Sequence, residues 1–217
     1  MGTVNESKPA AASGFPAALA FGVLWGSAEA TLGHLLHLAR IPGLAGFVMF
    51  PVALFFLARA YGSTGRLSVL PAAAAVAAAV KLVDAFLPGA DLWAALNPAQ
   101  AIFLEGLAVT ALFGVSGKPV RLRPIPVALT ALSWRFVFLL AGRGESALPG
   151  ASNAWTSGFA FRLDFLLVGT AAQTAAILLL ASLIFSRSGS LAAPVLRPRP
   201  AAVAILGAAA LIVEALL

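Results

Sequence analysis

Seven long apolar runs divide this sequence, and they constrain its fold more than any other feature. Within the third run, residues 72–80 (AAAAVAAAV) carry no polar side chain. Inside a lipid bilayer every backbone N–H and C=O must be paired within the protein, so only helices or a closed barrel can cross. A barrel strand would alternate apolar and polar residues, and these runs do not alternate. The sequence therefore predicts an all-α fold, a polytopic bundle of transmembrane helices.

Glycine and proline residues between the runs predict six core spans and a seventh, C-terminal span. Each run is long enough to cross about 30 Å of hydrocarbon with variable tilt. Residues 1–14 are predicted to form a polar cytoplasmic tail, and residues 15–217 a single transmembrane helical domain. Asn97 is predicted to cap the fourth span, with Pro98 at its first helical position. The predicted spans are 15–38, 43–60, 68–87, 98–116, 125–141, 159–185 and 200–217.

Composition and motifs exclude several classes of function. The chain is 61% hydrophobic and 10% charged, whereas soluble domains are roughly 45–50% apolar and 25% charged. It has no cysteine, which excludes disulfides, thiolate metal sites and a cysteine nucleophile. The net charge is +6, but the basic residues lie in short connectors, so we expect a lipid bilayer and no nucleic acid as partner. Neither a G-x-x-x-x-G-K-[ST] loop nor a G-x-S-x-G elbow is present, and we expect no enzymatic activity.

An asymmetry among the basic residues predicts the orientation of the chain. If the spans alternate in direction, nine basic residues fall on one side and three on the other. Such a bias places the N-terminus in the cytoplasm and indicates a bacterial-type inner membrane. The alternative is a signal peptide that begins near Lys8, but the apolar pattern continues to Leu38 and favours a complete span. The inner side holds Lys8, Arg59, Arg66, Lys118, Arg121, Arg123, Arg187, Arg197 and Arg199, and the outer side holds Arg40, Arg143 and Arg162.

Polar residues from five spans gather in the predicted outer half of the membrane. A charged side chain at the bilayer centre costs roughly 2.5–3.5 kcal/mol on insertion scales, so such residues usually face a cavity, a partner or a substrate path. This distribution predicts a site for a small polar solute that opens to the outside. The predicted substrate-binding residues are His34, His37, Lys81, Asp84, Asn97, Gln100, Glu105 and Arg135.

Some charged residues also have plainer structural interpretations. Lys81 and Asp84 are three residues apart and can neutralise each other. Arg162 and Asp164 lie close enough to the membrane interface to be ordinary rim charges.

Arg135 is harder to explain structurally, because apolar residues flank the segment 133–136 (SWRF) on both sides. It needs an anionic partner, which Glu105, Glu29 or a substrate anion could supply. In the binding hypothesis Arg135 and Lys81 attract an anion. The residues that would orient it are Asp84, Asn97, Gln100 and His37.

Two histidines suggest an alternative function. His34 and His37 are three residues apart, so they share a helix face and could reach one metal ion. The plainer interpretation is a pair of hydrogen-bonded or interfacial side chains. The alternative function is therefore an intramembrane metal- or haem-binding protein or enzyme, and the sequence leaves the cofactor unknown.

The segment 142–158 is long for a connector and rich in Gly, Ser and Asn, with Trp155 as its large anchor. It suits a mobile lid over an outer site. It equally suits a plain loop whose tryptophan lies in the interfacial belt.

Span one carries small residues at four-residue spacing, namely Ala18, Gly22, Gly26 and Ala30. Such a stripe allows another helix to approach closely. That helix can belong to this chain or to another membrane protein, and the second case allows a third function, a membrane scaffold.

Residues 24–34 (LWGSAEATLGH), 81–84 (KLVD) and 97–99 (NPA) resemble substrate-binding S components of energy-coupling factor transporters. These are small six-helix membrane subunits with cytoplasmic N-termini, which bind a vitamin or metal ion from the outer face. The resemblance covers spans one to six and implies a substrate-capture subunit of an energy-coupled importer, with a transmembrane coupling subunit and ATPase subunits as partners. It also implies that Ala18, Gly22, Gly26 and Ala30 dock the coupling subunit.

Overall fold

The computed structural model describes residues 14–38, 44–86, 91–116, 122–185 and 200–216, and all regular structure within these ranges is helical. Six of the described helices are long and apolar enough to cross a membrane, which confirms the predicted polytopic helical bundle. The predicted N-terminal tail lies almost entirely outside the described residues. The elements are α1 (Gly14–Ala28), η1 (Glu29–Gly33), α2 (His34–Leu38), α3 (Leu44–Thr64), α4 (Val69–Lys81), η2 (Leu82–Phe86), α5 (Leu92–Ser116), α6 (Pro124–Glu145), α7 (Phe159–Leu163), η3 (Asp164–Val168), α8 (Gly169–Phe185) and α9 (Pro200–Leu216).

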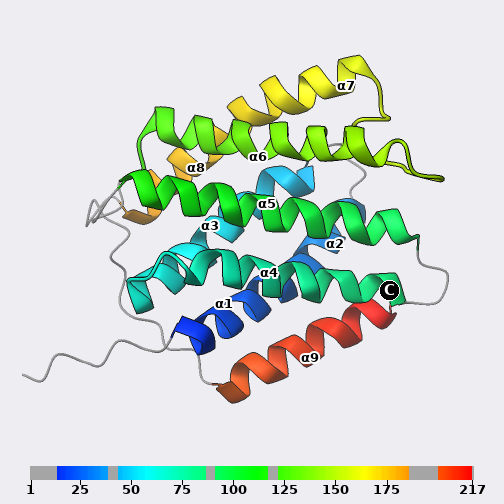
Figure 1. The fold of residues 1–217 in the computed structure, drawn as a ribbon. Coiled ribbons are helices and arrows are strands. Elements are labelled where there is room, and N and C mark those ends of the chain that lie inside the picture. Colours follow the sequence, from blue (N-terminus) through cyan, green and yellow to red (C-terminus); the bar gives the residue numbers. More distant parts are fainter. Residues whose placement is uncertain (1–13, 39–43, 87–90, 117–121, 186–199, 217) are drawn as a thin grey trace, which may run out of the picture.

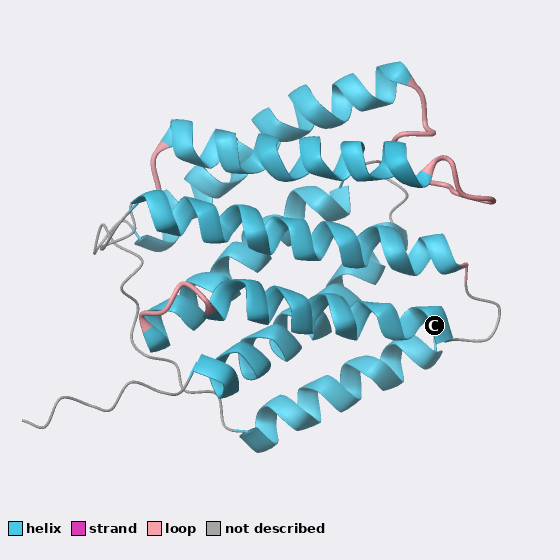
Figure 2. Cartoon of the chain, viewed as in Figure 1, coloured by secondary structure: helices cyan, strands magenta, loops and turns pink. Residues whose placement is uncertain are grey.

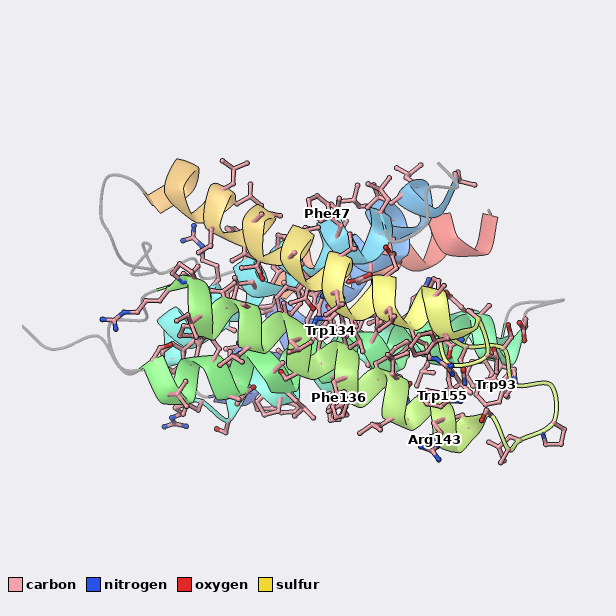
Figure 3. The ribbon with its side chains drawn as sticks, turned by 90° about the horizontal axis from the view of Figure 1, so that it is seen from above. Phe47, Trp93, Trp134, Phe136, Arg143 and Trp155 are labelled. Carbon is pink, nitrogen blue, oxygen red and sulfur yellow. The ribbon has the colours of Figure 1, made fainter. Side chains whose placement is uncertain are left out.

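The six spans form a ring of packed helices arranged in two layers (Figures 1 and 3). Around the ring α1 packs on α4, α4 on α5, α5 on α6, α6 on α8, α8 on α3, and α3 on α1. The described connecting loops, pink in Figure 2, lie at the ends of the bundle. The seventh helix, α9, lies along α1 at the edge of the bundle (Figure 1), where a Cβ on Gly207 would approach Val23 Cγ1 to 2.8 Å. Within the ring α3 also packs on α4 and α5.

The small-residue stripe of the first span packs against α4. A Cβ added at Gly22 would lie 2.6 Å from the carbonyl oxygen of Ala73, and one at Gly26 would lie 2.7 Å from Val80 Cβ. Ala18 and Ala30, at the ends of the stripe, are buried. The helix that approaches the stripe therefore belongs to this chain, and these four residues do not form a free surface for a coupling subunit.

The fourth span begins at Leu92 rather than at Pro98. Asp91 caps it, because Asp91 Oδ1 accepts a hydrogen bond of 3.0 Å from the backbone N–H of Trp93, as expected of an N-cap carboxylate. Pro98 lies inside α5, and a membrane helix tolerates the missing bond when neighbouring helices pack around it. The prediction that Asn97 caps this span is therefore wrong, since an earlier residue provides the cap.

We expect Asp91→Ala to lower the free energy of unfolding by about 1 kcal/mol, because an orphan backbone N–H at the start of α5 loses its acceptor. Asp91→Asn keeps a side-chain oxygen at the same position and should unfold like the original protein. Unfolding of the detergent-solubilised protein, followed by circular dichroism, measures both. Equal stability of the two variants would show that the cap contributes nothing.

Candidate functional site

The helix ring encloses a pocket of about 520 Å³, here called the central pocket. This volume is within the range of roughly 300–1,000 Å³ that is typical of small-molecule sites. Its walls come from η1, α3, α5, α6 and the continuous helix α7–η3–α8. Its lining residues are Glu29, Leu44, Ala45, Gly46, Phe47, Met49, Asn97, Pro98, Ala101, Ile102, Glu105, Trp134, Arg135, Phe138, Phe161, Asp164, Phe165, Val168, Gly169 and Ala172.

The lining is largely apolar but contains four ionisable residues, namely Glu29, Glu105, Asp164 and Arg135. Asn97 adds an amide. Three of the predicted site residues, Asn97, Glu105 and Arg135, are thus brought together. Glu29 and Asp164 also line the pocket. From the sequence, Glu29 was expected only as a possible partner of Arg135, and Asp164 only as a charge near the membrane interface.

Two π-helical segments line the central pocket. Glu29 is the first residue of η1, and Asp164 is the first residue of η3. A π-helical turn interrupts the regular α-helical register and often marks a functional site. In the described part of the chain, both π-helical segments therefore contribute a carboxylate to the pocket.

Arg135 is held by neutral and aromatic groups. Its side chain is 4% exposed, and Nη1 donates to Gln173 Oε1 and, at 3.3 Å, to the carbonyl oxygen of Ala131. The guanidinium carbon lies 4.7 Å from the ring centroid of Trp134 and 5.3 Å from that of Phe165, within the range of cation–π attraction. Nε is buried and has no hydrogen-bond partner.

The predicted ion pair between Arg135 and a carboxylate is not formed. Among the described residues neither Glu105 nor Glu29 makes a salt bridge with Arg135. The physical reason is that α8 presents Gln173 to the guanidinium, and the amide oxygen takes the position that a carboxylate was expected to fill.

Gln173, which holds Arg135 beside the pocket, was missed by the sequence interpretation. It is fully buried, accepts a hydrogen bond of 3.1 Å from Trp134 Nε1, and donates one of 2.8 Å to the carbonyl oxygen of Gly46. It thereby joins α8, α6 and α3 around Arg135. A lone amide in the apolar stretch 171–180 (AAQTAAILLL) was the available signal, because a buried amide in a membrane requires partners.

The α6 helix turns Trp134, the neighbour of Arg135, toward the interior of the bundle. Trp134 is 4% exposed and points into the space between the two layers, whereas Phe136 is 52% exposed and points away from it (Figure 3). Gly169 of α8 makes room for the arginine, since a Cβ there would lie 3.0 Å from Arg135 Nε. Local packing therefore fixes the guanidinium beside the pocket.

The two glutamates differ in their surroundings. Glu29 Oε1 accepts a hydrogen bond of 3.1 Å from Trp25 Nε1, one helical turn earlier. Glu105 is 3% exposed and receives no hydrogen bond from any other described residue, while the charges that act on it are those of Glu29 and Arg135. A buried carboxylate without hydrogen bonds is costly, so Glu105 is a polar group of the pocket that a bound ligand would stabilise.

A hydrogen-bonded loop covers one end of the bundle beside the pocket. Asn97 Nδ2 donates to the carbonyl oxygen of Ser152 at 2.7 Å, and Asn153 Nδ2 donates to that of Gly142 at 3.0 Å. Trp155 lies near the guanidinium carbons of Arg162, at 4.2 Å, and of Arg143, at 5.5 Å; Figure 3 shows Trp155 and Arg143 at this end. Residues 146–158 are thus tied to α5 and α6.

The remaining predicted site residues lie elsewhere. Lys81 and Asp84 form an ion pair with each other and do not line the pocket. Gln100 Nε2 donates to Glu145 Oε1 at 2.6 Å and likewise lies outside the lining. Lys81 and Arg135 therefore do not converge on one anion.

The two histidines belong to α2, but their side chains lie outside the part of the structure that is described. Within the described residues, no group of three or more His, Asp or Glu side chains could hold a metal ion. Metal or haem binding by His34 and His37 stays a prediction.

Comparisons with protein-family models, with curated proteins and with solved structures found no match. Function is therefore argued from the site itself.

Proposed function

We propose that this protein is a substrate-capture subunit of an energy-coupled importer, which binds a small polar solute in the central pocket without changing it chemically. The observation that carries this proposal is a pocket of about 520 Å³ with two buried polar side chains. These are Arg135, whose Nε has no hydrogen-bond partner, and Glu105, which receives no hydrogen bond from any other described residue. Within a membrane bundle such groups are costly unless a ligand completes them.

The orientation of the helices supports capture from the outside. The pocket is lined from the end of the first span, the beginning of α3, the first half of α5 and the middle of α6. The positive-inside rule favours an outward position for the end of the first span and the beginning of α3, in a bacterial-type inner membrane with a cytoplasmic N-terminus. Energised import would then use an ion gradient or a coupling subunit with separate ATPase subunits.

The test is mass spectrometry, organic and elemental, of the gently solubilised protein. We expect a stoichiometric small solute in the original protein. Ala101→Phe should lose that solute while the fold persists, because Ala101 lines the pocket and the larger ring would fill it. Ala111→Phe is the matched control, since Ala111 is an exposed alanine of the same helix outside the lining.

Three results would contradict the proposal. If the protein is empty and no solute from a broad panel raises its melting temperature, a scaffold is favoured. If solute retention survives Ala101→Phe, the pocket assignment is wrong. Stoichiometric haem would favour the alternative that uses His34 and His37.

A further inference from the structure

We propose that the solute is an organic cation with an aromatic or similarly flat apolar body. This inference rests on the proposed function and names the chemical class that the central pocket accepts.

The charge balance of the pocket is negative. Glu29, Glu105 and the exposed Asp164 contribute three acidic side chains against the one guanidinium of Arg135. Lys81 acts electrostatically on Glu29, but it lies outside the lining and forms its ion pair with Asp84. Uncompensated charges are unfavourable in a low-dielectric bundle, so a bound cation is the counter-charge that the lining lacks.

The unpartnered atoms include acceptors that an ammonium group would satisfy. Glu105 receives no hydrogen bond from any other described residue, and Asn97 Oδ1 is buried without a partner. An ammonium group donates up to three hydrogen bonds and bonds most strongly to carboxylates. Arg135 has one unpartnered donor, Nε, but its guanidinium group already contacts the rings of Trp134 and Phe165 and donates a hydrogen bond to Gln173.

The walls favour an extended organic body over a bare metal ion. The pocket carboxylates do not converge into a group of three metal ligands among the described residues. Phe47, Phe138 and Phe161 line the same space as the acids, and aromatic faces attract organic ammonium groups as well as flat rings.

The test compares three probes that share an indole ring and differ in charge. They are tryptamine (a cation), tryptophol (neutral) and indole-3-acetate (an anion), each titrated into the full-length purified protein by calorimetry and by melting temperature. We expect tryptamine to bind at least about tenfold more tightly than the other two, as one charge-assisted hydrogen bond would provide. Glu105→Gln and Glu29→Gln should each remove that preference.

Asp91→Asn is the matched control, because it removes an exposed carboxylate outside the pocket and keeps the helix cap. Tightest binding of indole-3-acetate, lost in Arg135→Gln but retained in Glu105→Gln, would overturn the cation assignment and leave the capture function standing. Equal binding of tryptamine and tryptophol would overturn it as well. If none of the three probes binds, the solute is not an aromatic cation. The capture function is tested separately, by the mass spectrometry of the co-purified solute.

Discussion

Gly22→Leu is expected to abolish the folded protein. A leucine side chain at this position would begin 2.6 Å from the carbonyl oxygen of Ala73 and 2.6 Å from Val76 Cβ. The first of these atoms is backbone, so the clash can be relieved only by separating α1 from α4. Overpacking of a core costs typically 1–3 kcal/mol and sometimes more, and loss of the α1–α4 contact would remove a large part of a stability of about 5–15 kcal/mol.

Size-exclusion chromatography in mild detergent measures this effect as loss of the monodisperse peak. Gly62→Leu is the matched control, because Gly62 is an exposed helical glycine with no atom within 4 Å of an added Cβ. It should stay folded, since leucine favours a helix over glycine. If Gly22→Leu eluted like Gly62→Leu, the close packing of α1 on α4 would be refuted.

The spans could be predicted well because their signal is local. Apolar runs and their Gly and Pro breakers mark where a helix enters and leaves hydrocarbon, and α3 and α6 begin within a residue or so of the predicted bounds. The beginning of α5 was misplaced because both Asp91 and Asn97 are N-cap residues. Only the packed fold shows that α5 continues through Pro98.

The pairing of polar groups could not be predicted in the same way. A helix that is apolar all round has no polar face to fix its rotation about its own axis. The sequence therefore shows that Arg135 needs a partner, but not that α8 turns Gln173 rather than a carboxylate toward it. The hydrophobic pattern of the sequence likewise does not predict the π-helical turns at Glu29 and Asp164, because such turns depend on how each helix packs against its neighbours.

Gln173→Leu is expected to destabilise the protein by roughly 3–5 kcal/mol, the usual cost of removing one partner of a buried charge. The change would leave Arg135 with only the carbonyl oxygen of Ala131, and would orphan Trp134 Nε1 and the carbonyl oxygen of Gly46. Gln100→Leu is the control, because Gln100 is only half-buried and makes its hydrogen bond near the bundle end. Thermal unfolding in detergent, with the two variants side by side, measures the difference, and equal melting temperatures would refute the role of Gln173.

The double variant Arg135→Leu/Gln173→Leu separates stability from binding. Removing both members leaves neither an unpaired guanidinium nor an unpaired amide between α6 and α8, so its stability should exceed that expected from adding the two single effects by about 1–3 kcal/mol. Strict additivity would mean that the two residues do not interact. A double variant that folds well and binds tryptamine as the original protein does would show that an apolar pair serves the fold as well and that the pocket carboxylates recognise the cation.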